Sequence, residues 1–303
     1  MTATDPKQTS ISLARIKSMN AIPGVHRTRY RSAFASAGVL LLVAVSAWAT
    51  TPVEVAKLIA EDSASNDFFG FSIALSDDTA VIGALRDDDN GVDSGSVHVF
   101  TRFGTKWSQQ TKLTAADSGA GDEFGGNVAL DGDIAVIGAR LDDDKGVDSG
   151  SANEFTRTGT ARSHQAKHTA SDRAACDEIC YSVAISGDTA VLGAVLADGV
   201  EPFSGAAYVF VRKGEVWSEQ AKLIADDGDA QDYFGQSVSV SGDTIVVGAF
   251  LHRAPDDTGY ARGAAYVFAR QGITWKQEVQ LLPRDSAVGD WFGGTVAISG
   301  STA

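Results

Sequence analysis

The sequence predicts an all-β protein built as a β-propeller, and three observations lead to that prediction. Nearly the same thirty residues occur twice, as "DFFGFSIALSDDTAVIGALRDDDNGVDSGS" over 67–96 and as "DEFGGNVALDGDIAVIGARLDDDKGVDSGS" over 122–151. Glycine is common and proline rare, 32 against 6, which is typical of chains with many tight turns. Each repeat also holds four strand-like segments, and four antiparallel strands repeated at this length describe a propeller blade.

Residues 1–49 have the features of a secretory signal peptide. Three arginines between positions 27 and 31 precede an apolar run over 33–49, which ends in "AWA". A basic segment, a short apolar segment and a small-residue site in this order predict cleavage after Ala49. The alternative is an uncleaved membrane anchor, although a run of this length is at the lower limit of what spans a bilayer.

The spacing of an aromatic–glycine pair predicts five repeats. The pair occurs in "DFFG", "DEFG", "DYFG" and "DWFG", which end at Gly70, Gly125, Gly235 and Gly293. The first step is 125 − 70 = 55 residues, and the second, 235 − 125 = 110, has "DEIC" at its midpoint. The predicted copies are about 67–121, 122–176, 177–231 and 232–289, followed by a partial copy at 290–303.

Each copy is expected to form four antiparallel strands, as the third copy illustrates. Its segments cover 182–186, 189–194, 205–212 and 216–225, and Gly187-Asp188 between the first two is a typical hairpin turn. A Gly-Ala pair recurs in the second segment, and small residues suit strands that approach closely near a propeller axis. The segment before the first copy resembles a fourth strand, so we expect an N-terminal strand that serves as the outer strand of a blade.

The signature residues of two copies resemble a known family. "FGGNVAL" followed by "VIGA" in copy two, and "FGQSVSVSGDTIVVGA" in copy four, are similar to the bacterial FG-GAP repeat, which is related to the β-propeller of integrin α-subunits. The resemblance extends over about 53–303. It implies a propeller with a role in extracellular binding or adhesion, and it implies no particular ligand.

The distribution of charge limits the partners. Residues 1–49 hold six Lys and Arg residues and one Asp, so residues 50–303 carry −14 − 5 = −19. A body this acidic repels nucleic acid and anionic lipid surfaces and attracts cations. We therefore expect an extracellular protein or glycan partner, no nucleic acid and no membrane insertion after signal cleavage. The expected location is secreted, periplasmic or at the cell surface.

Two aspartate-rich loops are the strongest candidates for a metal site. Ca²⁺ takes six to eight oxygen ligands on a flexible loop, and spaced aspartates supply them. The alternative is a solvated loop in which Asp and Gly form turns by capping backbone amides. The predicted calcium ligands are Asp87, Asp89 and Asp93 in copy one and Asp142, Asp144 and Asp148 in copy two.

These loops depart from the D-x-D-x-D-G-x-x-D pattern that binds calcium in integrin-like blades. Arg86 stands where that pattern has its first acid, and Lys145 of copy two stands at the position of Asn90. An ammonium inside a calcium site repels the ion, so copy two is expected to bind less well than copy one. Calcium is the only cofactor that the sequence indicates.

The residues around the aromatic–glycine pair are expected to be structural. The Asp that precedes the pair occurs in all five copies, so a turn hydrogen bond to nearby amides is the simpler role. The aromatic side chains are expected to pack between blades. They are Phe69, Phe124, Phe234 and Phe292.

The boundary between copies two and three departs from the pattern. Cys176 and Cys180 replace glycines, and a disulfide between them suits an exported protein, although their separation is short. Glu154 and His168 stand where other copies have apolar residues, and Arg162 stands where they have Trp. These changes indicate relaxed constraint at one blade boundary.

The sequence lacks the motifs of common hydrolase and nucleotide-binding sites. It has no G-x-S-x-G, no H-E-x-x-H and no G-x-x-x-x-G-K-[ST], so no catalytic residues are predicted. The first interpretation is a non-enzymatic scaffold for extracellular binding or adhesion. The alternative is the propeller portion of a larger extracellular hydrolase whose catalytic domain lies outside this chain, and the full-length reading frame would distinguish the two.

Overall fold

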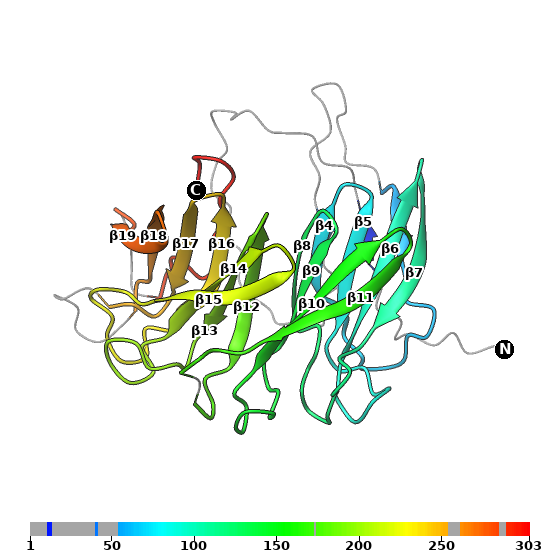
Figure 1. Ribbon diagram of the computed structural model, residues 1–303, viewed down its shortest axis with the longest axis horizontal. Helices are drawn as coiled ribbons and strands as arrows, with labels where there is room; N and C mark the ends of the chain where they lie inside the picture. The colour runs from blue at the N-terminus through cyan, green and yellow to red at the C-terminus, as the bar shows by residue number, and fades with distance from the viewer. Residues whose placement is uncertain (1–10, 14–39, 42–53, 173, 254–260, 285–288) are drawn as a thin grey trace.

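The computed structural model describes residues 11–13, 40–41, 54–172, 174–253, 261–284 and 289–303, and it confirms the all-β prediction. Four antiparallel sheets of four strands each follow one another along the chain and lie side by side (Figure 1). We call them blades 1 to 4. Each blade falls within one of the sequence repeats.

The strands of each blade pair in chain order. Blade 1 holds β4 (Phe69–Ser76), β5 (Thr79–Ala84), β6 (Ser96–Phe103) and β7 (Lys106–Leu113). Blade 2 holds β8 (Asn127–Asp131), β9 (Ile134–Ala139), β10 (Ser151–Thr158) and β11 (Ala161–His168). Blade 3 holds β12 (Ile179–Ser186), β13 (Thr189–Ala194), β14 (Ala206–Lys213) and β15 (Val216–Leu223). Blade 4 holds β16 (Phe234–Ser241), β17 (Thr244–Ala249), β18 (Ala264–Gln271) and β19 (Thr274–Leu281).

The strands predicted for the third copy are all present, with one early start. β12 begins at Ile179 rather than at Ser182, because its register with β13 shifts between these two residues and the strand bulges there. The hairpin that follows turns at Gly187, whose φ of 55° is left-handed and suits glycine.

The blades pack on one another through the aromatic residue of each repeat. The first strands of neighbouring blades contact each other, so these strands lie innermost. Phe124 and Phe234 are 0% and 1% exposed and lie in clusters that hold residues of two blades, which confirms their predicted packing between blades. Phe69 is 2% exposed and packs within blade 1 and against Leu58 of the N-terminal segment. Phe124 meets Phe155 edge to face, with ring centroids 6.2 Å apart. Phe292, after blade 4, is 37% exposed, so the predicted packing between blades is wrong for this residue.

A glycine in the second strand sets how closely two blades approach. A Cβ at Gly83, Gly193 or Gly248 would overlap the carbonyl oxygen of the glycine that follows the aromatic residue of the next repeat. Because this contact is made by backbone on both sides, a larger residue fits only if a blade moves. The Gly-Ala pair thus marks a close approach, as predicted, between neighbouring blades.

The predicted N-terminal strand is β3 (Ala56–Leu58), and it joins none of the four blades. It pairs with β1 (Ile11–Leu13), which runs parallel to β2 (Leu40–Leu41), in a separate three-stranded sheet. The expected place as an outer strand is already filled in each blade by a fourth strand of its own. Most of the predicted signal peptide, 1–49, lies outside the described residues. The described part of the chain contains no helix that is long and apolar enough to cross a membrane.

Candidate functional site

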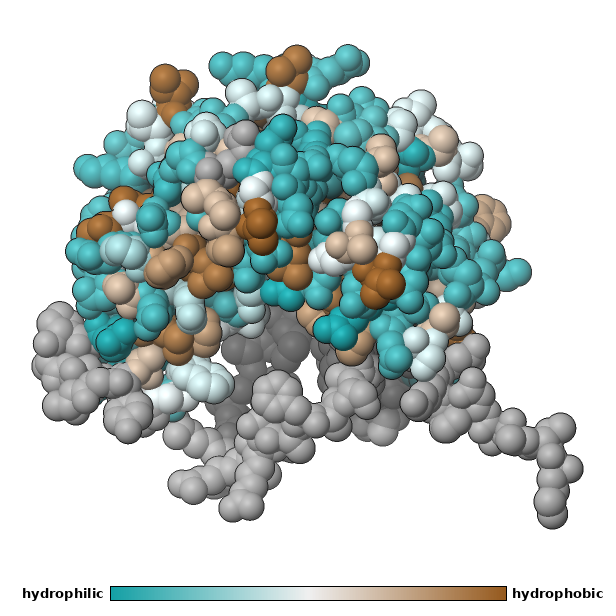
Figure 2. Space-filling view, turned by 90° about the horizontal axis from the view of Figure 1, so that it is seen from below, coloured by the Kyte–Doolittle hydropathy of each residue, from teal (hydrophilic) through white to brown (hydrophobic). Residues whose placement is uncertain are grey.

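Two sets of connections meet at the same end of the blades. In an antiparallel blade, the connection between strands two and three and the connection that leads to the next blade leave from one end. Figure 1 shows this end at the bottom, and we call it the loop end. The opposite end, which carries the two hairpins of each blade, is the hairpin end. The view from below shows separate hydrophobic patches in a mainly hydrophilic surface (Figure 2).

The aspartates between β5 and β6 fold their own loop. One carboxylate oxygen of Asp87 accepts the N–H of Asp89 at 3.1 Å, and the other accepts the hydroxyl of Ser96 at 2.9 Å. Asp88 accepts the N–H of Asp93 at 2.8 Å, and Asp93 has a left-handed φ of 55°. The turn-forming role is therefore present for Asp87 and Asp88.

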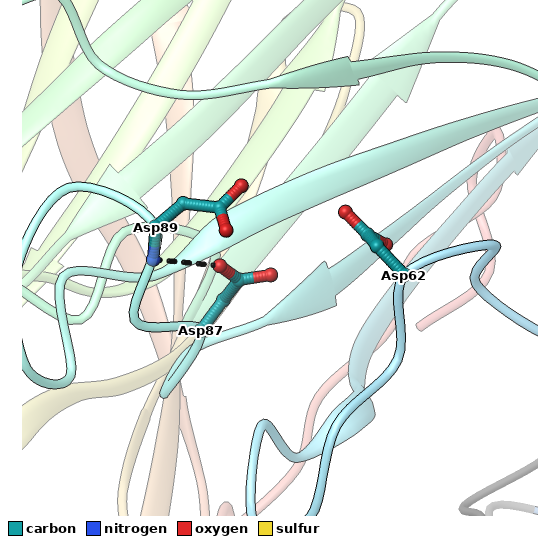
Figure 3. A group of neighbouring side chains, drawn as sticks. All are labelled: Asp62, Asp87 and Asp89. Carbon is teal, nitrogen blue, oxygen red and sulfur yellow. Dashed lines mark hydrogen bonds between the residues drawn. The ribbon is translucent and has the colours of Figure 1, made fainter.

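Lys112 of β7 reaches into this loop. Its Nζ lies 2.7 Å from Asp87, 2.5 Å from Asp89 and 2.8 Å from Asp62, which belongs to the connection between β3 and β4. The three carboxylates face a common space (Figure 3). We call these four residues cage 1. Asp87 lies at its buried side, since it is only 4% exposed.

Blade 2 repeats the arrangement. Lys167 of β11 lies 2.6 Å from Asp142, 2.5 Å from Asp144 and 2.7 Å from Asp117, which follows β7 of the preceding blade. We call these four residues cage 2. Asp142 accepts the N–H of Asp144 and the hydroxyl of Ser151, as Asp87 does with its own neighbours. The two cages are thus copies of one design.

Each cage holds its lysine in the charged form. Burial lowers the pKa of Lys112, but the hydrogen bonds that it donates to its three aspartates outweigh burial and raise that pKa well above its usual 10.5. The pKa of Lys167 is raised for the same reasons. Burial also raises the pKa of Asp62, but Lys112 and His98 lower it by more. Each cage therefore places three carboxylate groups around one charged ammonium.

The cages as they stand do not fit a calcium ion. Each trio of aspartates places one oxygen apiece within 4.8 Å of the others, and such a set of carboxylates suits a cation. The lysine ammonium already fills the space between them. Two cations at hydrogen-bond separation repel each other, so an ion would first have to displace the lysine.

Only four of the six predicted calcium ligands are in the cages. Asp93 lies outside cage 1, and its carboxylate is 4.0 Å from the guanidinium of Arg86. Asp148 lies outside cage 2, and its N–H donates to Asp143 at 2.8 Å. Lys145, which was expected to weaken the site in copy two, is exposed, and the ion pairs of the cage are made by Lys167 instead. Calcium binding by these loops stays a prediction. The position of the lysine ammonium between the carboxylates argues against it.

Blades 3 and 4 keep the same link with fewer charges. Lys222 of β15 binds Asp172 at 2.7 Å. In blade 4, Gln280 takes the place of the lysine and donates to Asp227 at 2.9 Å. In all four blades, a residue of the fourth strand therefore binds an acid in the connection that enters that blade.

Comparison with known proteins assigns the repeats. A family model described as the FG-GAP repeat matches residues 52–100, 107–153, 163–210, 217–268 and 275–303. The chain belongs to the FG-GAP repeat family. No curated protein matches it. Among solved structures it is similar to TolB from Acinetobacter baumannii, with 9% identity and a TM-score of 0.41. That similarity covers 75% of this chain and 46% of the TolB chain, so this chain spans less than half of TolB.

Two members of each cage in this FG-GAP repeat protein were missing from the sequence prediction. They are the acid of the connection and the lysine of the fourth strand, which come from elements far from the aspartate loop. A signal for them exists in the sequence, because both recur at a spacing of 55 residues. The acid stands at Asp62, Asp117, Asp172 and Asp227, and the lysine at Lys112, Lys167 and Lys222.

The Asp before each aromatic–glycine pair forms a turn, as predicted. Asp67 accepts the N–H of Ala64 at 2.6 Å, and Asp122 accepts that of Gly119 at 2.7 Å. Asp177 and Asp232 make the same bond three residues upstream. Burial raises the pKa of Asp67 and of Asp122, and the N–H bond offsets this in part.

The residue after this Asp presents a variable side chain at the loop end. Its φ lies between 48° and 56° in all five repeats, so the turn itself requires a left-handed conformation there. The backbone is constant while the side chain changes. The residues are Phe68, Glu123, Glu178, Tyr233 and Trp291.

Side chains at this position contact the neighbouring blade connections. Arg140 binds Glu123 at 2.7 Å and Glu178 at 3.4 Å, and so bridges two successive repeats. Tyr233 stacks on Phe250, with ring centroids 5.8 Å apart. This position is thus charged in the second and third repeats and aromatic in the first, fourth and fifth.

Both cysteines are free thiols in the described structure. Cys176 is exposed, whereas Cys180 is buried against Gly138 of the preceding blade. Burial raises the pKa of the Cys180 thiol well above its usual 9.0, so this thiol stays protonated and unreactive. The disulfide that the sequence allowed is not formed here.

The polar residues at the boundary of copies two and three form a buried pair. Glu154 and His168 are 2% and 6% exposed, and a carboxylate oxygen of Glu154 lies 3.6 Å from Nε2 of His168. His168 also packs on Phe210 and Trp217 of blade 3. Glu154 and His168 thus compensate each other. The expectation of relaxed constraint is therefore not needed to explain these two positions.

Proposed function

We propose that this FG-GAP repeat protein is a secreted, non-enzymatic scaffold that binds an extracellular protein or glycan through its loop end. The observation that carries the proposal is a constant framework with a variable surface. The buried aromatic residue, the close-approach glycine and the turn Asp repeat along the chain. The side chain between the turn Asp and the aromatic residue changes from repeat to repeat, and it is exposed in Phe68 and Trp291. Binding residues are typically carried on loops that a rigid scaffold positions.

The chemistry of the loop end supports a protein or glycan ligand. Phe68, Phe71 and Trp291 are 44%, 58% and 58% exposed. Exposed aromatic rings offer large, rigid contact surfaces, and Arg140, whose side chain is 32% exposed, offers hydrogen-bond donors. The strongly acidic body disfavours nucleic acid and anionic lipid as partners. The non-enzymatic part of the proposal is supported by the sequence, which carries none of the catalytic motifs named above.

Binding is tested with the secreted chain on arrays of glycans and of extracellular matrix proteins. The loop-end variant carries Phe68→Ala and Tyr233→Ala. Its matched control carries Phe103→Ala and Ile273→Ala, which remove residues 94% and 75% exposed at the hairpin end. We expect the loop-end variant to lose at least 1.4 kcal/mol, about a tenfold weaker Kd, on any ligand that the parent binds. Equal binding by both variants would overturn the assignment of the loop end.

Export rests on the basic segment, the apolar run and the "AWA" site at the N-terminus. Sequencing of the protein from culture medium or periplasm should give a chain that begins at Thr50. A membrane-bound chain that retains Arg31 would contradict cleavage. Adhesion and calcium binding are separate from this test.

A further inference from the structure

A lysine fills the centre of each aspartate cage, and this placement has a consequence for metal binding. We propose that Lys112 and Lys167 are the resident cations of the two cages, each ammonium taking the place of a divalent ion. Each lysine then fastens its blade to the connection from the preceding strand without metal. This inference is independent of what the loop end binds.

The number of N–H donors on each lysine ammonium matches the number of carboxylate acceptors in its cage. A lysine ammonium has three N–H donors and no acceptor. In cage 1 the three acceptors come from Asp62, Asp87 and Asp89, at 2.5 to 2.8 Å, and cage 2 repeats the count. Each ammonium is therefore fully satisfied. The side chains of Lys112 and Lys167 are only 17% and 18% exposed.

Each cage connects segments that lie far apart in the sequence. Asp117 follows β7 of blade 1, whereas Lys167 lies on β11 of blade 2, so the ion pair joins blade 2 to the connection that enters it. Asp142 and Asp144 belong to the connection between β9 and β10. One ammonium thus holds together three segments that the fold brings to one place.

Neither blade 3 nor blade 4 keeps three acids, and only blade 3 keeps the lysine. In blade 3, Ala197 and Gly199 occupy the places of Asp142 and Asp144, and Lys222 keeps one acid and lies 5.4 Å from the ring centroid of Tyr208. In blade 4 the lysine is lost to Gln280 and one cage acid is replaced by His252. Three acids thus occur only where a lysine is present to neutralise them.

The proposal predicts that the lysine is what keeps calcium out of each cage, and that the three carboxylates would bind calcium if the lysine were removed. Three carboxylates within 4.8 Å of each other, with their ammonium removed, would repel one another and attract a divalent ion. Lys167→Met should therefore turn cage 2 into a calcium site. Lys222→Met removes the corresponding lysine beside a single acid and is the matched control.

The experiment measures the melting temperature of the full chain, and the Kd for calcium by calorimetry, in EDTA and in millimolar CaCl₂. We expect the parent and Lys222→Met to show no calcium-dependent shift. We expect Lys167→Met to melt lower than the parent in EDTA, to recover in calcium, and to bind with a Kd on the order of 10⁻⁴–10⁻³ M. A calcium response of equal size in the parent would overturn the proposal. So would a folded Lys167→Met protein that shows none.

A measurement on the parent protein keeps the proposal testable even if Lys167→Met fails to fold. Lysine acetylation by acetic anhydride, followed by mass spectrometry, compares the caged Lys112 and Lys167 with the exposed Lys145. We expect slower labelling of the caged lysines, with the same rates in EDTA and in calcium. Caged lysines that label as fast as Lys145, or that label faster when calcium is added, would contradict the proposal.

Discussion

The junction between blades 1 and 2 and the junction between blades 2 and 3 use the same repeat positions with opposite chemistry. At the first junction, Val99, Leu113 and Phe124 are buried in one apolar cluster. At the second, the positions 55 residues later hold Glu154, His168 and Ile179. All three are buried as well, at 2%, 6% and 0% exposure.

The difference shows that the repeat fixes the place of a side chain more strictly than its polarity. A lone carboxylate at the position of Glu154 would be costly, because a buried charge without a partner loses its hydration. His168 supplies that partner from the adjacent strand, since β10 and β11 are paired in one sheet. A polar residue is tolerated at the junction when its partner is present.

The largest effect should follow from emptying the apolar junction. Phe124→Ala removes a fully buried ring that packs on Phe155, and it should cost about 3–5 kcal/mol of the free energy of unfolding. Ile179→Ala, the corresponding change at the polar junction, removes less volume and should cost less. Urea unfolding of both variants measures the difference. Unchanged stability of Phe124→Ala would show that the repeat register is wrong.

A somewhat smaller effect should follow from breaking the buried pair. His168→Leu restores the residue that other repeats carry but leaves Glu154 without its partner, at a cost of about 3 kcal/mol. The double variant Glu154→Val with His168→Leu makes the second junction like the first, and it should lie within about 1 kcal/mol of the parent or above it. Additive effects in this double-mutant cycle would mean that the two residues are not coupled.

Acid should weaken the polar junction selectively. Burial by itself raises the pKa of Glu154, but His168 and Trp217 outweigh burial, and the pKa is lowered from its usual 4.5. A lowered pKa in the folded state contributes stability above the unfolded pKa, and this contribution is lost as the pH falls through the folded value. The stability difference between the parent and Glu154→Gln should therefore shrink below about pH 4.5. A constant difference down to pH 3 would exclude this linkage.

His252 offers a milder test of a buried histidine beside acids. Its Nδ1 lies 2.7 Å from Asp232, and Asp227, Tyr266 and Gln280 also face its ring. Burial lowers the pKa of His252, but Asp232 and the nearby acids outweigh burial, and the pKa is raised above 6.5. The charged imidazole therefore contributes stability below pH 6.5, and this is lost as the pH rises through the raised value.

The readout for His252 is the stability difference between the parent and His252→Gln, followed from pH 6 to pH 9. We expect the difference to decrease with rising pH. Lys112, which links blade 1 in the corresponding region, stays charged over this range and should give a Lys112→Met difference that does not change. A His252 difference as flat as that of Lys112 would mean that the imidazole does not titrate in this window.

The sequence predicted features that depend on the pattern within one repeat. It did not predict the sites that are formed by residues from several elements. The strands, the turn at Asp67 and the burial of Phe124 follow from patterns within one repeat, and the structure confirms them. The loop aspartates were recognised for the same reason. Lys112 was missed because it approaches Asp87 only after β7 pairs with β6, and Asp62 because it arrives from the preceding connection.

The pair at the second junction was missed for a related reason. Glu154 and His168 are fourteen positions apart and look like two unrelated departures from an apolar pattern. Strand pairing brings the two residues close together, since Ala152 lies opposite His168 and Glu154 lies two residues further along β10. A search for paired changes across a predicted hairpin would have found them.

The glycine of the second strand has an evolutionary consequence. Gly83, Gly193 and Gly248 meet the carbonyl of the next repeat, so the pitch from blade to blade is set by main-chain atoms that every copy shares. A unit of 55 residues with such a main-chain spacer can be duplicated in tandem, and each duplicate seats at the right distance before its side chains have adapted. Afterwards the side chains at the junctions are free to diverge. At the junction between blades 2 and 3, a glutamate and a histidine have replaced apolar side chains without altering the spacing.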